Sequence, residues 1–398
     1  MNNYKKPLIP IAPVLSAFFR LFFRAKDLSS YPSLLSANSV RMTTSGRMGI
    51  ALALEHAGIG KGDRVLVPAF HCSSMIEPVI WSGAEPVFYR IRKDTGVDMA
   101  DVESKLDSSV KMIMVTHFFG FHQDMKSIKA FCDERGILIL EDCAHGFFGS
   151  LAGKPIGSWG DYAIGSSMKF FPVYDGGCLV SDKRDLSTIQ LTSAGKSFEL
   201  KALLNAIENA REYKRLKLLN TLIHPLLWLK DFVWKLLKRN AGDKSTLSIG
   251  PGASDGGFDF EEAWVHKSMS TISEFIVSHI PKRKMVERRL ENYRFLEESL
   301  SELEGIRPLH PSLPEGTVPY VYSVYVENPG PVFHDLKTKR VPIIRFGEFL
   351  WEGVDETVCP VSVEYSQHIF QFPCHQEFRQ SELDWMVTEI KNTLKNYK

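Results

Sequence analysis

The chain has 398 residues, of which 44% are hydrophobic and 24% charged, and these proportions exclude wholesale disorder. Lysine and arginine total 48 against 47 acidic residues, so the net charge of +1 gives no reason to expect a nucleic-acid partner. The length suits one large or two medium domains. No two of the six cysteines form a CxxC pair, which favours reduced thiols in a cytoplasmic protein over a zinc ribbon or a disulfide scaffold.

The first 23 residues place basic residues before an apolar run, in the order of a signal peptide. Pro7, Pro10 and Pro13 interrupt the run, and no clear small-residue cleavage site follows. We therefore expect an aromatic-rich helix that packs on the body of the protein, not a cleaved signal. No uninterrupted apolar stretch reaches the roughly 20 residues that cross a bilayer.

Strand-like and helix-like segments alternate between residues 45 and 182. A helix is predicted over 47–57, ended by the glycines of GIGKGD, and another over 125–136. Short apolar strands separated by helices predict an α/β fold, with a mostly parallel sheet covered on both faces. Ligands bind such sheets at the carboxyl ends of the strands. The predicted strands are VLVP (65–68), PVFY (86–89), MIMVTH (112–117), ILILED (137–142), YAIG (162–165) and CLVS (178–181).

A basic segment follows the alternating region. Between Arg211 and Arg239 there are eight basic and two acidic residues, with leucines at helical spacing and Pro225 between two predicted helices. One interpretation is an amphipathic helix on a membrane surface, which would make residues 211–240 a peripheral contact with the inner face of the membrane. The other, which we favour, is a helical pair docked on the protein's own core or on a second subunit.

A Gly/Ser-rich stretch at 245–258 predicts the junction between two domains. We assign residues 1–245 to a large ligand-binding domain and residues 246–398 to a smaller α+β domain. The second domain is predicted to hold a long helix over 261–303 that is broken or bent at Pro281, a strand over 321–326 and a closing helix over 381–394.

Three features could carry chemistry. Asp142 ends a buried apolar strand, where a carboxylate is costly unless a positive group meets it. Lys169 follows another strand in an apolar setting, which suits an amine that attacks carbonyl carbons. The turn SGRMG at 45–49 runs into a helix whose free N–H groups, together with Arg47, suit a phosphate. Each feature also has a purely structural interpretation. Asp142 could form an internal salt bridge, Lys169 could be a surface lysine, and the turn could be an ordinary helix start.

Together these features match what pyridoxal 5′-phosphate (PLP) requires. Its aldehyde joins a lysine, its ring nitrogen pairs with a carboxylate, and its phosphate needs an anion site. A metal site built from His117, His122 and nearby acidic residues is the weaker interpretation, because no metal-binding spacing such as HExxH is present. We therefore expect no metal.

The chain resembles the DegT/DnrJ/EryC1/StrS family of PLP-dependent sugar aminotransferases, which have the aspartate-aminotransferase-like fold (fold type I). The resemblance is specific, because the order of the segments, their spacing and their glycines all match the family pattern. Weaker traces occur in GGFDFEEAW (256–264) and FPCHQEF (372–378). The matching segments are SGRMGIALALEHAGIGKGDRVLVPAF (45–70), GAEPVFY (83–89), THFFGFHQDM (116–125), EDCAHGFFGSLAGKPIGSWGDYAI (141–164), the segment around Lys169, and SDKRD (181–185).

The resemblance implies a role for each matched residue. Lys169 would be the Schiff-base lysine and the proton carrier, Asp142 the partner of the ring nitrogen, and His145 a cofactor contact. The phosphate-binding turn would be Ser45, Gly46, Arg47 and Met48.

The chain departs from the family pattern at three places. Ile164 stands where the family often has a phosphate-binding serine, a role that Ser166 could take over. Gly46-Arg47 stands where the family commonly has Gly-Thr in the first turn. For the side chain that covers the cofactor ring, a separate question, His71 is our choice, with Cys72 as the alternative. Residues 257–261 read GFDFE where the family often has GYNYR, which would place negative charge near a phosphate.

The resemblance implies a cytoplasmic homodimer that moves an amino group from an amino acid such as glutamate to a keto sugar by a ping-pong mechanism. We expect the sugar to be nucleotide-linked and the product to serve polysaccharide biosynthesis. A sugar dehydratase of the same fold is one alternative, although related dehydratases replace the lysine that this chain keeps. A non-catalytic, membrane-associated protein is another, motivated by the altered 257–261 loop and the basic segment.

Overall fold

The computed structural model describes residues 4–16, 31–215 and 260–397. Most of the basic segment at 211–240, the predicted domain junction at 245–258 and the first residues of the 257–261 loop lie outside these ranges. The two interpretations of the basic segment and the predicted domain boundary therefore stay predictions.

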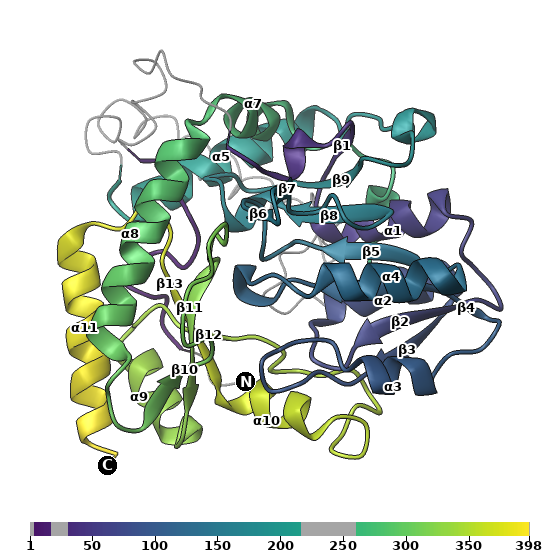
Figure 1. Cartoon of the computed structure of the whole chain (residues 1–398). Coiled ribbons are helices and arrows are strands. Elements are labelled where there is room, and N and C mark those ends of the chain that lie inside the picture. Colours follow the sequence, from purple (N-terminus) through teal and green to yellow (C-terminus); the bar gives the residue numbers. More distant parts are fainter. Residues whose placement is uncertain (1–3, 17–30, 216–259, 398) are drawn as a thin grey trace, which may run out of the picture.

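A seven-stranded sheet forms the larger part of the molecule, in the order β1-β9-β8-β5-β4-β2-β3. Strands β2, β3, β4, β5 and β8 run parallel, whereas β9 is antiparallel to both of its neighbours. Helices cover both faces, with α4 on one side and α1 and α2 on the other (Figure 1). This is the predicted mostly parallel α/β sheet. The strands are β1 (Ser39–Thr43), β2 (Arg64–Pro68), β3 (Glu85–Tyr89), β4 (Val110–Thr116), β5 (Leu138–Asp142), β8 (Tyr162–Ser166) and β9 (Gly177–Ser181).

All six strands predicted between 65 and 181 are present, because their apolar residues are buried in the sheet. The predicted helices match α1 (Gly46–His56) and α4 (Met125–Arg135) within one residue. Local signals set the ends of α4, since the Asp124 side chain accepts from Ser127 N–H and Gly136 ends the helix at φ 65°. Strand β1 and the helices α2 (Ser73–Trp81), α3 (Met99–Ser104) and α5 (Lys196–Glu212) were not predicted from the sequence.

A second, four-stranded antiparallel sheet lies beside the first, in the order β10-β11-β13-β12. Helices α8, α9 and α11 cover its outer side, at the left of Figure 1. The strands are β10 (Ile306–Pro308), β11 (Val321–Val326), β12 (Ile344–Arg345) and β13 (Ile369–Pro373), and the helices are α8 (Lys282–Leu300), α9 (Pro329–Thr338), α10 (Pro360–His368) and α11 (Gln380–Lys395). The predicted strand at 321–326 and the closing helix are confirmed.

The long helix predicted over 261–303 is two helices. The first, α7 (Thr271–His279), begins ten residues later than predicted, where the Ser270 hydroxyl accepts the N–H of Ser273. Pro281 then separates α7 from α8, as predicted. Helix α7 packs against α5, and Ser268 bridges to Thr43 in the edge strand of the large sheet, so this part of the predicted small domain packs with the large one.

The N-terminal residues 4–16 lie in an extended conformation against the C-terminal part of the chain. Leu8 N–H donates to the carbonyl of Arg340, and His375 Nε2 lies 2.8 Å from the carbonyl oxygen of Pro10. The helix expected for the N-terminal segment is thus not formed in residues 4–16, where the prolines cannot donate helical hydrogen bonds. Residues 17–23 lie outside the described ranges.

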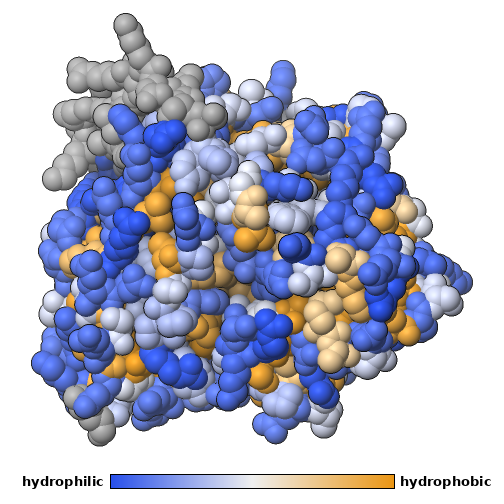
Figure 2. Space-filling view, in the orientation of Figure 1, coloured by the Kyte–Doolittle hydropathy of each residue, from blue (hydrophilic) through white to orange (hydrophobic). Residues whose placement is uncertain are grey.

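The described helices include none that combines the length and the apolar composition needed to span a membrane. On the face drawn in Figure 2, hydrophilic residues predominate and hydrophobic residues lie in small patches among them.

Glu377 is a buried carboxyl group at the junction of the N-terminal segment and the residues that follow α5. Burial raises its pKa to about 7, a shift that the Ser16 hydroxyl and the nearby charge of Arg215 only partly offset. Because the folded pKa lies above the ordinary value of 4.5, the folded state binds more protons than the unfolded state between these pH values. The stability of the protein therefore falls as the pH rises through this window.

We expect Glu377→Gln to raise the free energy of unfolding by up to about 3 kcal/mol at pH 8, and to leave it unchanged near pH 4. Urea unfolding of both proteins at the two pH values measures the difference. A difference that does not depend on pH would contradict the assigned cause.

Candidate active site

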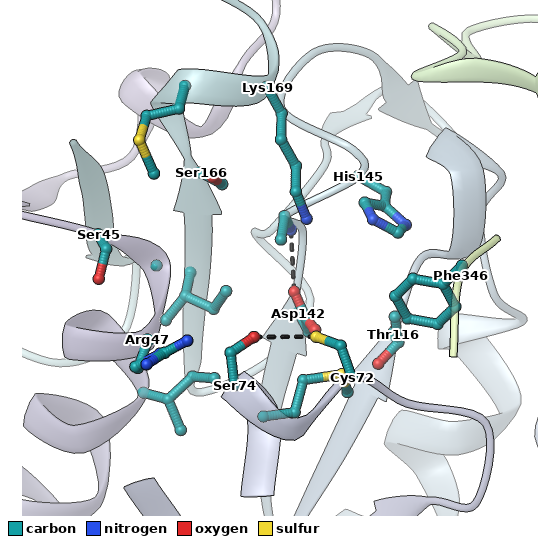
Figure 3. A pocket seen from close by; sticks show the side chains of 16 residues that line it. Ser45, Arg47, Cys72, Ser74, Thr116, Asp142, His145, Ser166, Lys169 and Phe346 are labelled. Carbon is teal, nitrogen blue, oxygen red and sulfur yellow. Dashed lines mark hydrogen bonds between the residues drawn. The ribbon is translucent and has the colours of Figure 1, made fainter. Parts of the chain in front are cut away.

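A cavity opens at the carboxyl ends of the parallel strands of the large sheet, and Phe346, from the region of β12, completes its lining (Figure 3). Such strand ends are where sheets of this type bind ligands. Lys169 extends into the cavity above Asp142, with Ser45 and Arg47 on one side and His145 and Phe346 on the other. The lining residues are Ser45, Gly46, Arg47, Ile50, Cys72, Ser74, Met75, Thr116, Asp142, Ala144, His145, Ile164, Ser166, Met168, Lys169 and Phe346.

Asp142 is the last residue of β5, so the buried strand carries its carboxylate to the floor of the cavity. The side chain is 3% exposed, and its Oδ1 accepts the N–H of Ala144 at 2.9 Å. Burial raises the pKa of Asp142, although Ala144 N–H and the charge of Lys169 act in the opposite direction. A cationic ligand group beside this carboxylate would therefore be strongly stabilised.

Lys169 ends a short 3-10 turn, Ser167–Lys169, that follows β8. The loop that carries it returns to β9 through Gly176, whose carbonyl accepts Ser167 N–H at 3.0 Å. Asp175 anchors this return, because its buried carboxylate accepts from Ser270 N–H, Ser270 Oγ and Ser273 Oγ at the start of α7. The lysine is thus held on a fixed loop of the core and is not a surface lysine.

The N-terminus of α1 forms one side of the cavity. Ser45 occupies the N-cap position but makes no side-chain capping bond, and its buried hydroxyl has no hydrogen-bond partner. The first N–H groups of a helix are likewise free of intrahelical partners. A Cβ on Gly177 would lie 2.3 Å from Gly46 N, so only glycine there lets β9 approach this turn so closely. These unpaired donors make the helix start a binding site for an anion.

Arg47 lines the same side, but it is not an isolated cation. Its Nη1 lies 3.2 Å from Oε2 of Glu77 on α2, and both side chains are buried. The pair ties α1 to α2 beneath the cavity. A buried ion pair of this kind fixes geometry, and Glu77 offsets the charge that Arg47 would offer an anion.

His145 stands opposite Arg47 in the cavity wall. Its ring stacks on Tyr320 with centroids 4.8 Å apart, and its Nδ1 accepts the N–H of Phe119. Burial, followed by the charge of Lys169, holds the pKa of His145 well below its ordinary value. The ring is therefore neutral, and with Nδ1 accepting, the proton is assigned to Nε2. His145 can donate a hydrogen bond to a ligand oxygen.

Two predicted cofactor residues do not line the cavity. The ring of His71 is fully buried behind it, where Nδ1 faces the carbonyl of Pro68 and Nε2 accepts the N–H of Trp351. Both nitrogens are thus engaged, and the ring stacks on Phe88. The Met48 side chain packs in the core, so at most its backbone faces the site.

Ser166 lines the cavity, and Ile164 lies there as well, so the role of Ser166 at the phosphate stays a prediction. Cys72, the alternative to His71, also faces it, and its Sγ lies 2.9 Å from Ser74 Oγ. Ser74, Thr116 and Phe346 were not predicted from the sequence. Thr116 could have been found as a polar residue at a strand end, whereas nothing in the sequence marks Phe346, which comes from the region of β12.

A cluster of three side chains that could coordinate a metal ion lies next to this site. His117, Glu141 and Cys143 are close enough together to hold an ion. The Glu141 carboxylate is already engaged, because it accepts from Trp159 N–H and Gly160 N–H and pairs with His117 Nε2 at 3.0 Å. This group forms an internal polar network that supports the floor of the cavity.

The described end of the 257–261 loop makes contacts of its own. Phe260 packs on Trp81 with ring centroids 5.5 Å apart, and the Glu261 carboxylate accepts from the indole N–H of Trp264. Neither Phe260 nor Glu261 lines the cavity.

Comparison with known proteins finds a matching family model and similar proteins. Residues 32–201 match the model of the DegT/DnrJ/EryC1/StrS aminotransferase family. This part of the chain, which is less than half of it, is similar to that family. The match contains the Asp142 strand end, the Lys169 loop and the start of α1.

Part of the chain is also similar to curated proteins that include sugar-modifying enzymes. The chain is 30% identical over 157 residues to the GDP-perosamine synthase of Vibrio cholerae, covering 39% of this chain and 43% of that protein. It is 33% identical over 149 residues to the UDP-N-acetyl-3-dehydro-alpha-D-glucosamine 3-aminotransferase of Acidithiobacillus ferrooxidans, covering 36% and 40%. The matched part thus spans about two fifths of these curated relatives.

The fold is shared over almost the whole chain. The PLP form of Spr1654 from Streptococcus pneumoniae superposes with a TM-score of 0.65 at 15% identity, covering 98% of this chain and 99% of that one. The protein therefore has the fold of the PLP-dependent aminotransferases, as predicted.

Proposed function

We propose that the protein is a PLP-dependent aminotransferase that moves an amino group from an amino acid, such as glutamate, to a keto sugar. One observation carries the proposal. Lys169, Asp142 and the open start of α1 lie around a single cavity, although they come from three separate parts of the chain. An amine, a carboxylate and an anion site in one cavity are the groups that PLP needs.

The residues of the cavity fit this cofactor. The buried hydroxyl of Ser45, which has no partner, and the N–H groups at the start of α1 suit the phosphate. Asp142, whose pKa burial raises, suits a protonated ring nitrogen, and neutral His145 suits the ring hydroxyl. Arg47 contributes less to the phosphate than its charge suggests, because Glu77 pairs with it.

When bound, PLP supplies an electron sink that stabilises negative charge on the carbon next to the substrate amine. Lys169 would serve as general base, taking a proton from that carbon, and then as general acid, returning a proton. Asp142 keeps the ring nitrogen charged. His145 would donate a hydrogen bond from Nε2 to hold the ring in place, and Phe346 and Ile164 form apolar parts of the cavity wall.

The named relatives support the substrate class. One is called a GDP-perosamine synthase and another an aminotransferase of a UDP-linked sugar, so we infer a nucleotide-linked keto sugar as the amino acceptor. Such a sugar would serve the synthesis of a polysaccharide. The fold and family also support a cytoplasmic homodimer, which remains part of the proposal.

The first experiment is the visible absorption spectrum of the purified protein with added PLP, before and after borohydride reduction. We expect a yellow band, and after reduction the mass of the cofactor on the peptide that contains Lys169. Addition of glutamate or glutamine before reduction should abolish the band and prevent the attachment. A folded protein without a band would instead favour the non-catalytic alternative.

Replacement of Ser45 tests the phosphate site without disturbing the fold. Removing an N-cap serine normally costs about 1 kcal/mol of stability. The Ser45 hydroxyl makes no capping bond, so we expect the Tm of cofactor-free Ser45→Ala to equal that of the wild type. The Kd for PLP should rise at least about 10-fold, since a hydrogen bond to a charged group is lost. Fluorescence titration with PLP measures it, and an unchanged Kd would contradict the assigned site.

A further inference from the structure

Arg289 is a fully buried arginine on α8, on the far side of the catalytic loop from α1. Its Nη1 donates to the carbonyl of Tyr320 at 2.8 Å, and its Nη2 donates to Oε1 of Gln376 at 3.2 Å. Its guanidinium carbon lies 4.7 Å from the centre of the Phe170 ring. None of these partners is a carboxylate, and burial lowers the pKa of the guanidinium. Burying a cation among neutral groups costs folding free energy, so this arginine is expected to have a role that offsets the cost.

Gln376 links this arginine to the catalytic loop. While its Oε1 accepts from Arg289, its Nε2 donates to the carbonyl of Phe170 at 2.9 Å. An amide has one accepting end and one donating end, so Arg289 determines which end faces Phe170. Phe170 is the residue directly after Lys169, and the bond therefore holds the backbone that carries the lysine.

The same guanidinium supports the opposite wall of the cavity. Arg289 holds the carbonyl of Tyr320, whose ring stacks on His145 at 4.8 Å and lies 5.7 Å from Lys169 Nζ. One buried cation thus connects the backbone behind Lys169 with the ring that packs on His145. Both Arg289 and Gln376 lie outside the segment 32–201 that matches the family model.

We propose that Arg289 and Gln376 are positioning residues for Lys169, which hold its loop at the distance from the cavity that proton transfer requires. This inference rests on the proposed function for its kinetic consequence, but its structural consequence, an ordered Lys169 loop, does not require a cofactor. Displacing a reacting group by about 1 Å can cost about 100-fold in rate, so a single hydrogen bond at Phe170 can matter.

The decisive variant is Gln376→Glu. A carboxylate keeps an acceptor for Arg289 and adds an ion pair, but it has no N–H group to donate to Phe170. We expect the Tm to equal or exceed that of the wild type, and the Kd for PLP to stay within about 3-fold, because the donor set of the phosphate and ring sites is unchanged. The rate of the first half-reaction with glutamate should fall about 100-fold.

Hydrogen exchange measures the loop itself in the cofactor-free protein. Exchange in the peptide that spans residues 167–176 should rise at least about 10-fold in Gln376→Glu, while peptides of the β4 and β5 core keep their wild-type protection. Arg289→Met should show the same local change if it folds. Arg294→Ala is the matched control, because Arg294 is an exposed arginine of the same helix. It should leave exchange and rate unchanged.

The outcomes separate the two proposals. Wild-type exchange and wild-type rate in Gln376→Glu would show that the pair only packs α8 against the sheet and would overturn the inference. If the wild-type protein binds no PLP, the proposed function fails, and the exchange data alone decide whether the pair holds the Lys169 loop.

Discussion

Replacing Asp142 by asparagine is expected to lower turnover at least about 1,000-fold, since the variant removes the charge that would stabilise a protonated ring nitrogen of the cofactor. Asparagine is nearly isosteric and can still accept the N–H of Ala144. The floor of the cavity therefore keeps its shape, and the loss comes from electrostatics. Steady-state kinetics with saturating PLP measure the effect, and full activity would refute the assignment.

The same variant is expected to stabilise the cofactor-free protein. Burial raises the pKa of Asp142, so in the wild type the charged carboxylate is disfavoured in the folded state and stability falls as the pH rises above the ordinary pKa of 3.8. The neutral asparagine side chain carries no such cost. The Tm of cofactor-free Asp142→Asn should therefore exceed that of the wild type at pH 7, with a smaller difference near pH 4. Loss of activity together with gain of stability would mark Asp142 as a functional residue.

Replacing Lys169 by alanine should lower turnover at least about 10,000-fold, because the variant loses both the amine that joins the cofactor and the group that moves the proton. The fold should persist, because Asp175 and the bond between Ser167 and Gly176 anchor the loop independently of this side chain. Borohydride treatment with PLP should leave no cofactor on the loop peptide.

Lys126→Ala serves as the control for this variant, because Lys126 is an exposed lysine of α4 outside the cavity. It should retain wild-type turnover and labelling. Retained turnover in Lys169→Ala, or cofactor attached to a different lysine, would remove Lys169 from the mechanism.

Much of this architecture follows from local patterns in the sequence. The apolar runs that end in Asp142 and Gly165 predict buried parallel strands, because only a sheet covered on both faces can bury such segments. Polar residues at the ends of these runs predict the site, because parallel strands present their carboxyl ends at one edge. The sequence proposes Asp142, Lys169 and the start of α1 in this way, the family resemblance adds His145, and Ser166 is proposed in place of the family serine. All of them line the cavity.

The tertiary structure determined which side chains face the cavity, because this depends on contacts between residues that are far apart in the sequence. His71 and Cys72 are neighbours in the sequence, but Trp351, 280 residues away, takes the imidazole nitrogen and leaves Cys72 to face the cavity. The sequence alone suggests that Arg47 binds a phosphate, but in the folded protein Glu77 on α2 forms an ion pair with it.

The proposed role of Gln376 and Arg289 depends on their contacts with Phe170, which lies more than one hundred residues earlier in the chain. Hydrogen bonds of this kind have no periodicity and no sequence spacing, since their geometry exists only after the two sheets have packed together. The sequence by itself therefore determined the strands, the lysine and the carboxylate, whereas packing decided how these groups are oriented and held.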